Sequence, residues 1–257
     1  MIGQEIPWGK KLTRLECDIT EPPQHLYPKL DSQHPEAILC LASLDLRQCQ
    51  ENPIRGISVN CFGNFQVAEY ANKKGIPFIQ ISTGSIFFGE KGKTFTESDT
   101  PCPQHTYGQS KVLLELLTQS HPLSLCLRTG WLFGGRKSDK IFDVLLKKTL
   151  LGEPVQANAE QWGSPTYLPD LIRQIEHFIE SQKAGTFHVV NEGGASALEF
   201  VEEAKRLSHS TSEVGPFENP KGMERSPSEV LTSNKGSLLR PWKDALKEYI
   251  ERGKHET

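Results

Sequence analysis

Short apolar runs in this chain alternate with amphipathic stretches of helical length. The runs at 36–42, 77–82 and 123–128 are continuous and apolar, as strands buried on both faces are. Between them, residues 56–74 and 107–120 repeat apolar side chains along one helical face. Strand, helix, strand, helix, strand is typical of a parallel sheet with crossover helices. The sequence therefore predicts an α/β fold built on a parallel sheet.

The pattern changes after residue 130. Residues 210–235 are rich in Ser, Pro, Glu and Gly and show little periodicity, which favours a loop-rich lobe over a site. Periodicity predicts a short strand at 186–190. It also predicts four helices, at 139–151, 168–182, 197–208 and 241–252.

The charge and the cysteine content exclude several classes of protein. With 29 basic and 32 acidic residues the formal net charge is −3, which gives no general attraction for nucleic acid or anionic lipid. No apolar run approaches the roughly 20 residues of a membrane helix, and Met1–Pro7 has no signal-peptide pattern. The six cysteines form no C-x-x-C pair and the eight histidines have no metal-like spacing. We therefore expect a cytoplasmic protein with reduced thiols and no metal.

Tyr107 and Lys111 are the strongest local chemical signal. They lie one turn apart on one face of a predicted helix, where an ammonium near a phenol lowers the phenol pKa. Thr83 closes a predicted strand, and ligands in open parallel sheets bind at the carboxyl ends of strands. The three groups suit carbonyl/alcohol interconversion beside a nicotinamide. The alternative is an ordinary surface Tyr and Lys with a threonine that serves a turn.

Seven ordered blocks of residues carry a family resemblance. They run from Ser82 to Leu246 and read S-T-x-x-I-F-x-G, E-x-D-x-P-x-P, Y-G-x-S-K, L-R-T-x-W-L-F-G, G-S-P-T-Y-x-x-D-L, G-T-F-H-V-V-N and L-R-P-W-K-x-A-L. Together these blocks resemble the dTDP-4-dehydrorhamnose reductase family, within the extended short-chain dehydrogenase/reductase superfamily. The similarity covers roughly residues 1 to 251.

The resemblance implies a fold, a cofactor and a reaction. The fold would be a Rossmann-type domain with helices on both faces of the sheet, over 1–133 with part of 160–185. A smaller substrate-binding lobe would comprise 134–160 and 186–257. The cofactor would be NADP or NAD, and the reaction the reduction of a nucleotide-linked 4-keto-6-deoxy sugar, as in dTDP-L-rhamnose biosynthesis. The nucleotide sugar would be the partner, with no nucleic acid and no membrane, and the chain would form a homodimer.

The resemblance also implies roles for individual residues. Tyr107 would give the proton to the C4 oxygen, Lys111 would hold the nicotinamide ribose and depress the Tyr107 pKa, and Thr83 would bind the reacting oxygen. Gly84 and Trp131 would contact the substrate, although Trp131 also suits a core aromatic position. Further cofactor contacts fall on Gly3 in the phosphate region, Asp18 and Ile19 near the adenine, Ala42 and Ser43 beside the ribose, and Asn60 near the active-site lysine.

The chain departs from the family pattern in three places. The family opens with a strand and G-x-x-G-x-x-G, whereas this chain has no G-x-G and matches that segment only from Gly3. We therefore expect an N-terminally truncated member with its first strand missing, a slot in the sheet and weak dinucleotide binding. Gly84 stands where the family usually has Asp, and Ser85 where it has Tyr. Residues 39–44 lack the usual polar groups, so these changes bear on sugar specificity.

Two other functions remain open at this point. A non-catalytic regulatory or binding subunit is one, because the β subunit of methionine adenosyltransferase shares this family. The altered N-terminal segment and loops favour it more than the intact Tyr107 and Lys111 do. An epimerase or dehydratase of the superfamily is the other, but it needs further acid/base residues, and Gly84 beside Thr83 offers no carboxylate.

Overall fold

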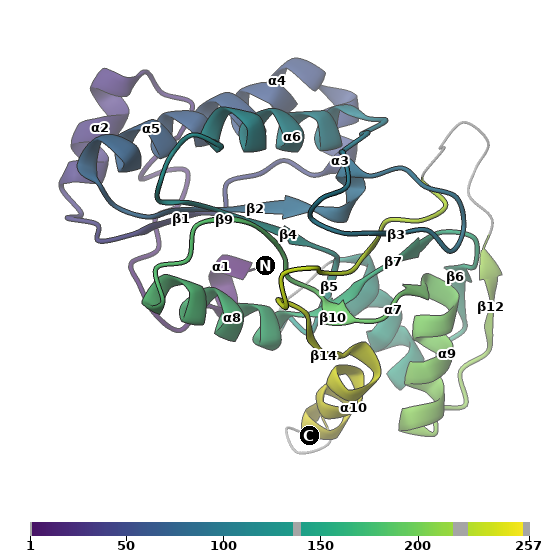
Figure 1. Cartoon of the computed structure of the whole chain (residues 1–257). Coiled ribbons are helices and arrows are strands. Elements are labelled where there is room, and N and C mark those ends of the chain that lie inside the picture. Colours follow the sequence, from purple (N-terminus) through teal and green to yellow (C-terminus); the bar gives the residue numbers. More distant parts are fainter. Residues whose placement is uncertain (1, 136–139, 218–225, 254–257) are drawn as a thin grey trace.

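Four parallel strands form the main sheet of the computed structural model, which describes residues 2–135, 140–217 and 226–253 (Figure 1). The strands are β1 (Ile38–Cys40), β2 (Phe78–Thr83), β4 (Ser124–Thr129) and β9 (Gly185–His188), in that order across the sheet. Each neighbouring pair is parallel. The predicted strands and their parallel arrangement are confirmed.

Helices cover both faces of this sheet, as expected from the crossover pattern. A continuous helical run, α4 (Pro53–Ile57), η1 (Ser58–Gly63) and α5 (Asn64–Lys74), connects β1 to β2. It ends at Gly75, whose φ of 68° is the left-handed conformation that glycine adopts without strain. Helix α6 (Thr106–Thr118) follows β2 on the same face, and α8 (Leu168–Glu180) with α1 (Ile2–Glu5) lies on the other (Figure 1).

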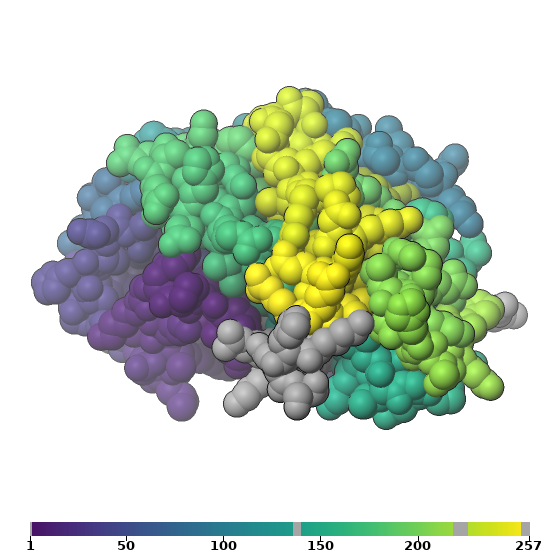
Figure 2. Space-filling view, turned by 90° about the horizontal axis from the view of Figure 1, so that it is seen from below, coloured from purple at the N-terminus to yellow at the C-terminus, as the bar shows by residue number. Residues whose placement is uncertain are grey.

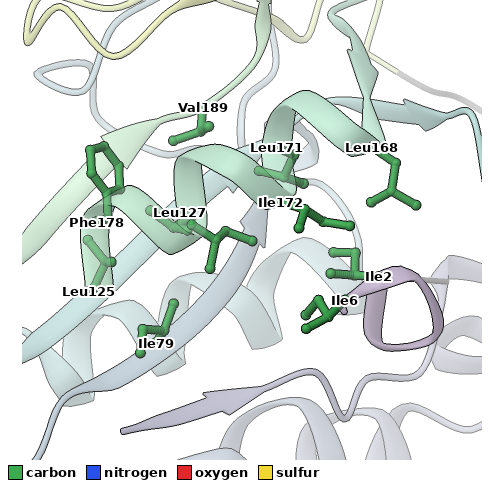
Figure 3. Close-up of a cluster of buried hydrophobic side chains, with 11 residues drawn as sticks. Ile2, Ile6, Ile79, Leu125, Leu127, Leu168, Leu171, Ile172, Phe178 and Val189 are labelled. Carbon is green, nitrogen blue, oxygen red and sulfur yellow. The ribbon is translucent and has the colours of Figure 1, made fainter. Parts of the chain in front are cut away.

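The core beneath the sheet joins segments that are distant in the sequence. Ile79 of β2 and Leu127 of β4 point toward Leu171 of α8, and Ile2 and Ile6 pack at the edge of the same cluster (Figure 3). Burying each such side chain contributes about 1.5–3 kcal/mol of transfer free energy. Seen from below, the N-terminal residues lie directly beside α8 (Figure 2). Apolar packing therefore holds the N-terminal segment against the sheet.

The predicted slot in the sheet is wrong. β1 is an edge strand: it pairs with β2 on one side, and no described residue of 2–37 forms a strand on the other. A slot needs strands on both sides of a gap, and the order β1-β2-β4-β9 has none beyond β1. Leu26 and Leu30 of α2 (Pro23–Asp31) join a buried cluster that includes Cys40 of β1.

A second lobe surrounds an aromatic core. Phe133, Phe142, Tyr167, Phe200 and Trp242 pack together there, with ring centroids of Phe133 and Tyr167 5.2 Å apart. Its elements are β5 (Trp131–Phe133), α7 (Ile141–Leu150), β6 (Val155–Asn158), β7 (Trp162–Gly163), β8 (Pro165–Tyr167), β11 (Ala195–Ser196), α9 (Ala197–Ser208), β12 (Val214–Phe217) and α10 (Trp242–Gly253). The remaining short elements are α3 (Leu46–Glu51), η2 (Gly84–Ile86), β3 (Thr94–Phe95), β10 (Asn191–Glu192), β13 (Val230–Leu231) and β14 (Leu239–Pro241).

The helices expected after residue 130 are confirmed as α7, α8, α9 and α10, each within a few residues of its expected limits. The expected start of the first, at 139, lies outside the described residues. The segment 210–235 contains β12 and β13, and its part 218–225 also lies outside them. The division of the chain near residue 133 stays a prediction. No helix in the described ranges is long and apolar enough to cross a membrane.

Candidate active site

Thr83 ends β2 at the carboxyl edge of the sheet. The chain turns there into η2, and the Thr83 Oγ1 accepts the backbone N–H of Ser85 at 3.1 Å. Threonine favours this position because its hydroxyl satisfies a donor at a helix start. Thr83 and Ser85 are both half-buried, so part of each residue remains accessible to solvent.

A close contact places the first turn of α6 beside this strand end. His105 caps the helix, its Nδ1 accepting the N–H of Gly108 at 3.0 Å. A Cβ at Gly108 would come within 2.6 Å of the Ser85 carbonyl oxygen, so only glycine permits this approach. The sequence Tyr107-Gly108 therefore brings the tyrosine to the end of β2.

The three predicted chemical residues come together at this point. The Tyr107 phenol lies close enough to the Thr83 hydroxyl for that hydroxyl to lower its pKa. The Lys111 Nζ lies 5.9 Å from the centroid of the Tyr107 ring and donates a hydrogen bond to the Ile81 carbonyl oxygen at 3.0 Å. Lys111 is buried and Tyr107 half-buried. A hydroxyl, a phenol and an ammonium thus share one corner of the sheet.

The expected lowering of the Tyr107 pKa is wrong for this structure. Burial raises the pKa of Tyr107 to about 12, the Thr83 hydrogen bond lowers it, and the nearby Cys49, Glu229 and Asp45 raise it further. Burial also lowers the pKa of Lys111. The desolvation of the phenol outweighs the nearby positive charge. Tyr107 is therefore a neutral phenol at neutral pH, which is the state that can donate a proton.

Asn60 anchors the loop that follows β1. It lies in the π-helical turn η1, a feature often found at functional sites. Its Oδ1 accepts the Leu44 N–H at 2.7 Å, and its Nδ2 donates to the Leu44 carbonyl at 3.0 Å. The Nδ2 of Asn64 similarly reaches the Ala42 carbonyl at 2.9 Å. These two amides fix Ala42 and Ser43 at the carboxyl end of β1, whereas the hydrogen bonds of Asn60 do not include Lys111.

Ile19, next to Asp18, packs against the same helical run. The Asp18 carboxylate accepts the hydroxyl and N–H of Thr20 and the Arg14 Nε, which together lower its pKa to about 2. Ile19 packs so closely on Gly63 that a Cβ there would lie 2.9 Å from it. A pocket of about 450 Å³ opens beside them, lined by Arg14, Thr20, Asn52, Ile54, Arg55, Ser58 and Val59. Gly3 lies apart from it, in α1 and in contact range of Leu41.

Trp131 is half-buried at the start of the second lobe. Its ring stacks on Phe142 with centroids 4.8 Å apart, and a Cβ at Gly163 would overlap the indole. Trp131 therefore packs on the aromatic core, which agrees with the expected core aromatic position, and part of the residue stays accessible. Its contact with substrate stays a prediction.

Glu229 is a site residue that the sequence reasoning missed. Its side chain is buried, with 6% of the residue exposed. Its Oε2 accepts the Ser85 hydroxyl at 2.8 Å, and its Oε1 accepts the Gln161 amide at 3.4 Å. A Cβ at Gly84 would lie 2.9 Å from the Glu229 carbonyl oxygen. The replacement of Asp by Gly84 was the one available signal, because it makes room for another segment.

Several polar residues of the ordered sequence blocks belong to two buried hydrogen-bond networks. Arg128 of β4 donates from Nη2 to Glu115 of α6 at 2.7 Å and lies 3.3 Å from the Nε2 of His188 in β9. The His188 Nδ1 donates to the Thr232 carbonyl at 2.7 Å, so Nε2 is the acceptor for Arg128. The Ser82 hydroxyl also donates to Glu115. This network ties three strands together directly behind Thr83.

The second network joins α8 to the C-terminal segment. Asp170 accepts the Asn191 Nδ2 at 2.9 Å and the Arg240 Nε at 2.9 Å. Arg240 also pairs with Glu248 of α10 at 2.6 Å, and the Asn191 Oδ1 accepts the Tyr167 N–H at 2.7 Å. These contacts tie α8 to β14 and α10. Among the described residues, no group of three or more His, Cys, Asp or Glu side chains is placed to hold a metal.

Comparisons with known proteins point to one family. A family model described as the RmlD substrate binding domain matches residues 9–255. The dTDP-4-dehydrorhamnose reductase of Mycobacterium tuberculosis is 27% identical over 252 residues, covering 91% of this chain and 82% of that protein. A crystal structure of a dTDP-4-dehydrorhamnose reductase from Clostridium acetobutylicum matches with 26% identity and a TM-score of 0.87, covering 98% and 95% of the two chains. The Bacillus anthracis reductase in complex with NADP matches with 25% identity and a TM-score of 0.84, covering 96% and 89%.

Proposed function

The chain belongs to the RmlD substrate-binding domain family, and from that premise we propose that it is an NAD(P)H-dependent reductase of a nucleotide-linked 4-keto-6-deoxy sugar. The product would be the corresponding 4-hydroxy sugar nucleotide, as in dTDP-L-rhamnose biosynthesis. The observation that carries the proposal is the convergence of Thr83, Tyr107 and Lys111 at the carboxyl end of β2.

The arrangement of these side chains supports a part for each of them in the reduction. The Thr83 and Tyr107 hydroxyls lie near each other, and both would hydrogen-bond the oxygen of the reacting carbonyl. As the carbonyl carbon is reduced, the Tyr107 phenol gives its proton to that oxygen. The Lys111 ammonium stabilises the phenolate that remains. A neutral phenol of raised pKa is the correct starting state for this direction of the reaction.

The residues present fit a nicotinamide dinucleotide. When bound, the reduced cofactor supplies the hydride. Lys111 donates one of its three ammonium N–H groups to the Ile81 carbonyl, so the other two can donate to ribose hydroxyls. Ala42 and Ser43 would lie along the ribose, and the pocket beside Asp18 and Ile19 has the size and polarity for the adenosine end. The two arginines of that pocket favour a phosphorylated ribose, and therefore NADPH.

Replacing Arg55 with glutamine is expected to weaken NADPH binding about tenfold, because a charge-assisted hydrogen bond to phosphate is lost. NADH lacks that phosphate, so its affinity should stay unchanged. Isothermal titration of both dinucleotides measures the difference, with Arg47→Gln on the exposed face of α3 as the control. Equal weakening of the two dinucleotides would contradict the assignment. The same titration tests the expected weak binding of any dinucleotide, which micromolar affinity for the wild-type chain would overturn.

We also propose that two copies of the chain associate through η1 and α6. Phe62, Leu113 and Leu116 are exposed on these two contacting helices, and an exposed apolar patch of this kind is typical of an association surface. Sedimentation velocity should give a dimer for the wild type and a monomer for Leu116→Asp. Leu15→Asp is the control, since Leu15 is exposed on a separate loop and should leave the dimer intact. A monomeric wild type would reject the proposal.

A further inference from the structure

The segment 226–231 closes over the turn that carries Thr83. Ser226 accepts the Gly89 N–H at 3.0 Å, Ser228 pairs with Gly89 in a β-bridge, and Glu229 donates its N–H to the Trp162 carbonyl at 2.8 Å. These contacts leave no room for a side chain at Gly84, where a Cβ would meet the Glu229 carbonyl oxygen at 2.9 Å. The position of Glu229 is thus fixed by its backbone as well as by its side chain.

Ser85 and Glu229 form a pair of defined polarity. The Ser85 hydroxyl has one proton, and it donates that proton to the Glu229 Oε2 at 2.8 Å. The remaining hydrogen-bonding capacity of the Ser85 oxygen is therefore as an acceptor. Its backbone N–H is also committed, because it donates to the Thr83 Oγ1. The half-buried Ser85 hydroxyl therefore presents only acceptor capacity, within two residues of Thr83.

The pair lies close to the reacting centre. Ser85 follows Thr83 in the same turn, and its carbonyl is packed by the first turn of α6, next to Tyr107. The negative charge of Glu229 is near enough to act on the Tyr107 phenol. Burying a carboxylate costs free energy unless it is hydrogen-bonded, and the partners of Glu229 include Ser85 and Gln161.

Building on the proposed function, we propose that the Ser85–Glu229 pair accepts a hydrogen bond from the sugar hydroxyl on the carbon next to the keto carbon. The pair then selects keto sugars that keep this hydroxyl over those that have lost it. A site built to bind a substrate hydroxyl discriminates strongly against the analogue without it, because the polar groups of the site are left unpaired. Glu229 thereby supplies a carboxylate close to position 84, where the family usually has Asp and this chain has Gly84.

The test compares two substrates in five proteins. The substrates are the nucleotide-linked 4-keto-6-deoxy sugar and its 3-deoxy counterpart. The four main proteins are the wild type, Ser85→Ala, Glu229→Gln and the control Glu160→Gln, and the double variant of Ser85 and Glu229 is a fifth. Glu160 is exposed in the loop between β6 and β7, where it pairs with Lys91, and it belongs neither to the Ser85–Glu229 pair nor to the site. We expect the wild type and the control to prefer the 3-hydroxy substrate by roughly 100-fold in kcat/KM. In Ser85→Ala the preference should fall by about tenfold, mainly through KM for the 3-hydroxy substrate.

Glu229→Gln should lower the preference in the same direction, and the double variant should lose little more than either single one, because the two side chains act as a unit. An unchanged preference in Ser85→Ala would overturn the proposal. Ser85→Ala alone decides the matter if Glu229→Gln does not fold, as a thermal melt will show.

Binding separates this proposal from the proposed function. The reduced 4-hydroxy sugar nucleotide and its 3-deoxy form are titrated into each protein without cofactor. Tighter binding of the 3-hydroxy form to the wild type, and loss of the difference in Ser85→Ala, supports the pair even if no reduction is detected. Equal binding of both forms to the wild type overturns the pair even if the chain is an active reductase.

Discussion

Replacing Tyr107 with phenylalanine is expected to slow reduction of the keto sugar by about 10²–10⁴-fold, the usual contribution of a positioned general acid. Binding of the nucleotide sugar should change little, because the ring and its packing remain. The Thr83 hydroxyl and the Lys111 ammonium also stay in place, so the loss falls on kcat. Oxidation of NADPH, followed by absorbance with the 4-keto-6-deoxy sugar nucleotide, measures the rate.

Tyr27→Phe is the matched control for that experiment, since Tyr27 lies in the middle of α2, packs on Tyr70 and should leave the rate unchanged. The pH profile gives a second readout. With a pKa raised to about 12 by burial, Tyr107 keeps its proton through neutral and mildly alkaline pH and loses it only as the pH approaches that value. The wild-type rate should therefore show no loss of a proton donor between about pH 6 and 9.

Equal rates in the wild type and Tyr107→Phe would reject the proton-donor role. A wild type that binds the nucleotide sugar but never reduces it would favour the regulatory subunit instead. Interconversion of sugar epimers without net oxidation of the cofactor would favour an epimerase.

Replacing Glu115 with leucine is expected to destabilise the fold by about 3–5 kcal/mol, because it leaves the buried Arg128 guanidinium without its carboxylate. The side chains of Glu115 and Arg128 are only 9% and 7% exposed, so water cannot replace the lost partner. The Ser82 hydroxyl loses its acceptor in the same variant. Chemical denaturation, followed by circular dichroism, gives the free energy of unfolding.

Glu251→Gln provides the comparison for that variant. Glu251 pairs with Lys247 on the surface of α10, where both side chains are more than half exposed, and such a pair contributes about 0.5 kcal/mol or less. The double variant Glu115→Leu with Arg128→Met should recover much of the stability, since it removes both charges. A loss of less than about 1 kcal/mol in Glu115→Leu would show that the network is dispensable.

The sheet and its crossover helices could be predicted because each strand is a short apolar run between two periodic stretches. Helix α2 was missed for the opposite reason. Its sequence holds Pro23 and Pro28, which read as helix breakers. Pro23 stands in the first turn, where proline fits, and burial of Leu26 and Leu30 against α5 holds the helix despite Pro28. Tertiary packing there overrides local propensity.

The candidate site divides in the same way. Tyr107, Lys111 and Thr83 could be found because helical spacing and a strand end place them locally. Glu229 could not, because 144 positions separate it from Ser85 and no spacing rule connects them. The raised pKa of Tyr107 was also beyond the sequence, since burial of the phenol decides the direction of the shift. The prediction of a slot was wrong because the sequence does not reveal that β1 lies at the edge of the sheet.

The π-helical turn at Ser58–Gly63 joins α4 to α5, and it determines how the side chains of α4 are rotated about the helix axis relative to those of α5. Its wider winding takes up one residue more per turn than an α-helix does. Removing one residue would restore a regular helix but rotate α4 by about 100° relative to α5. Arg55 would then leave the pocket wall, and Asn60 would release Leu44. The six residues of this turn therefore fix the orientation of α4 relative to α5, and with it the positions of the pocket wall and of the loop after β1.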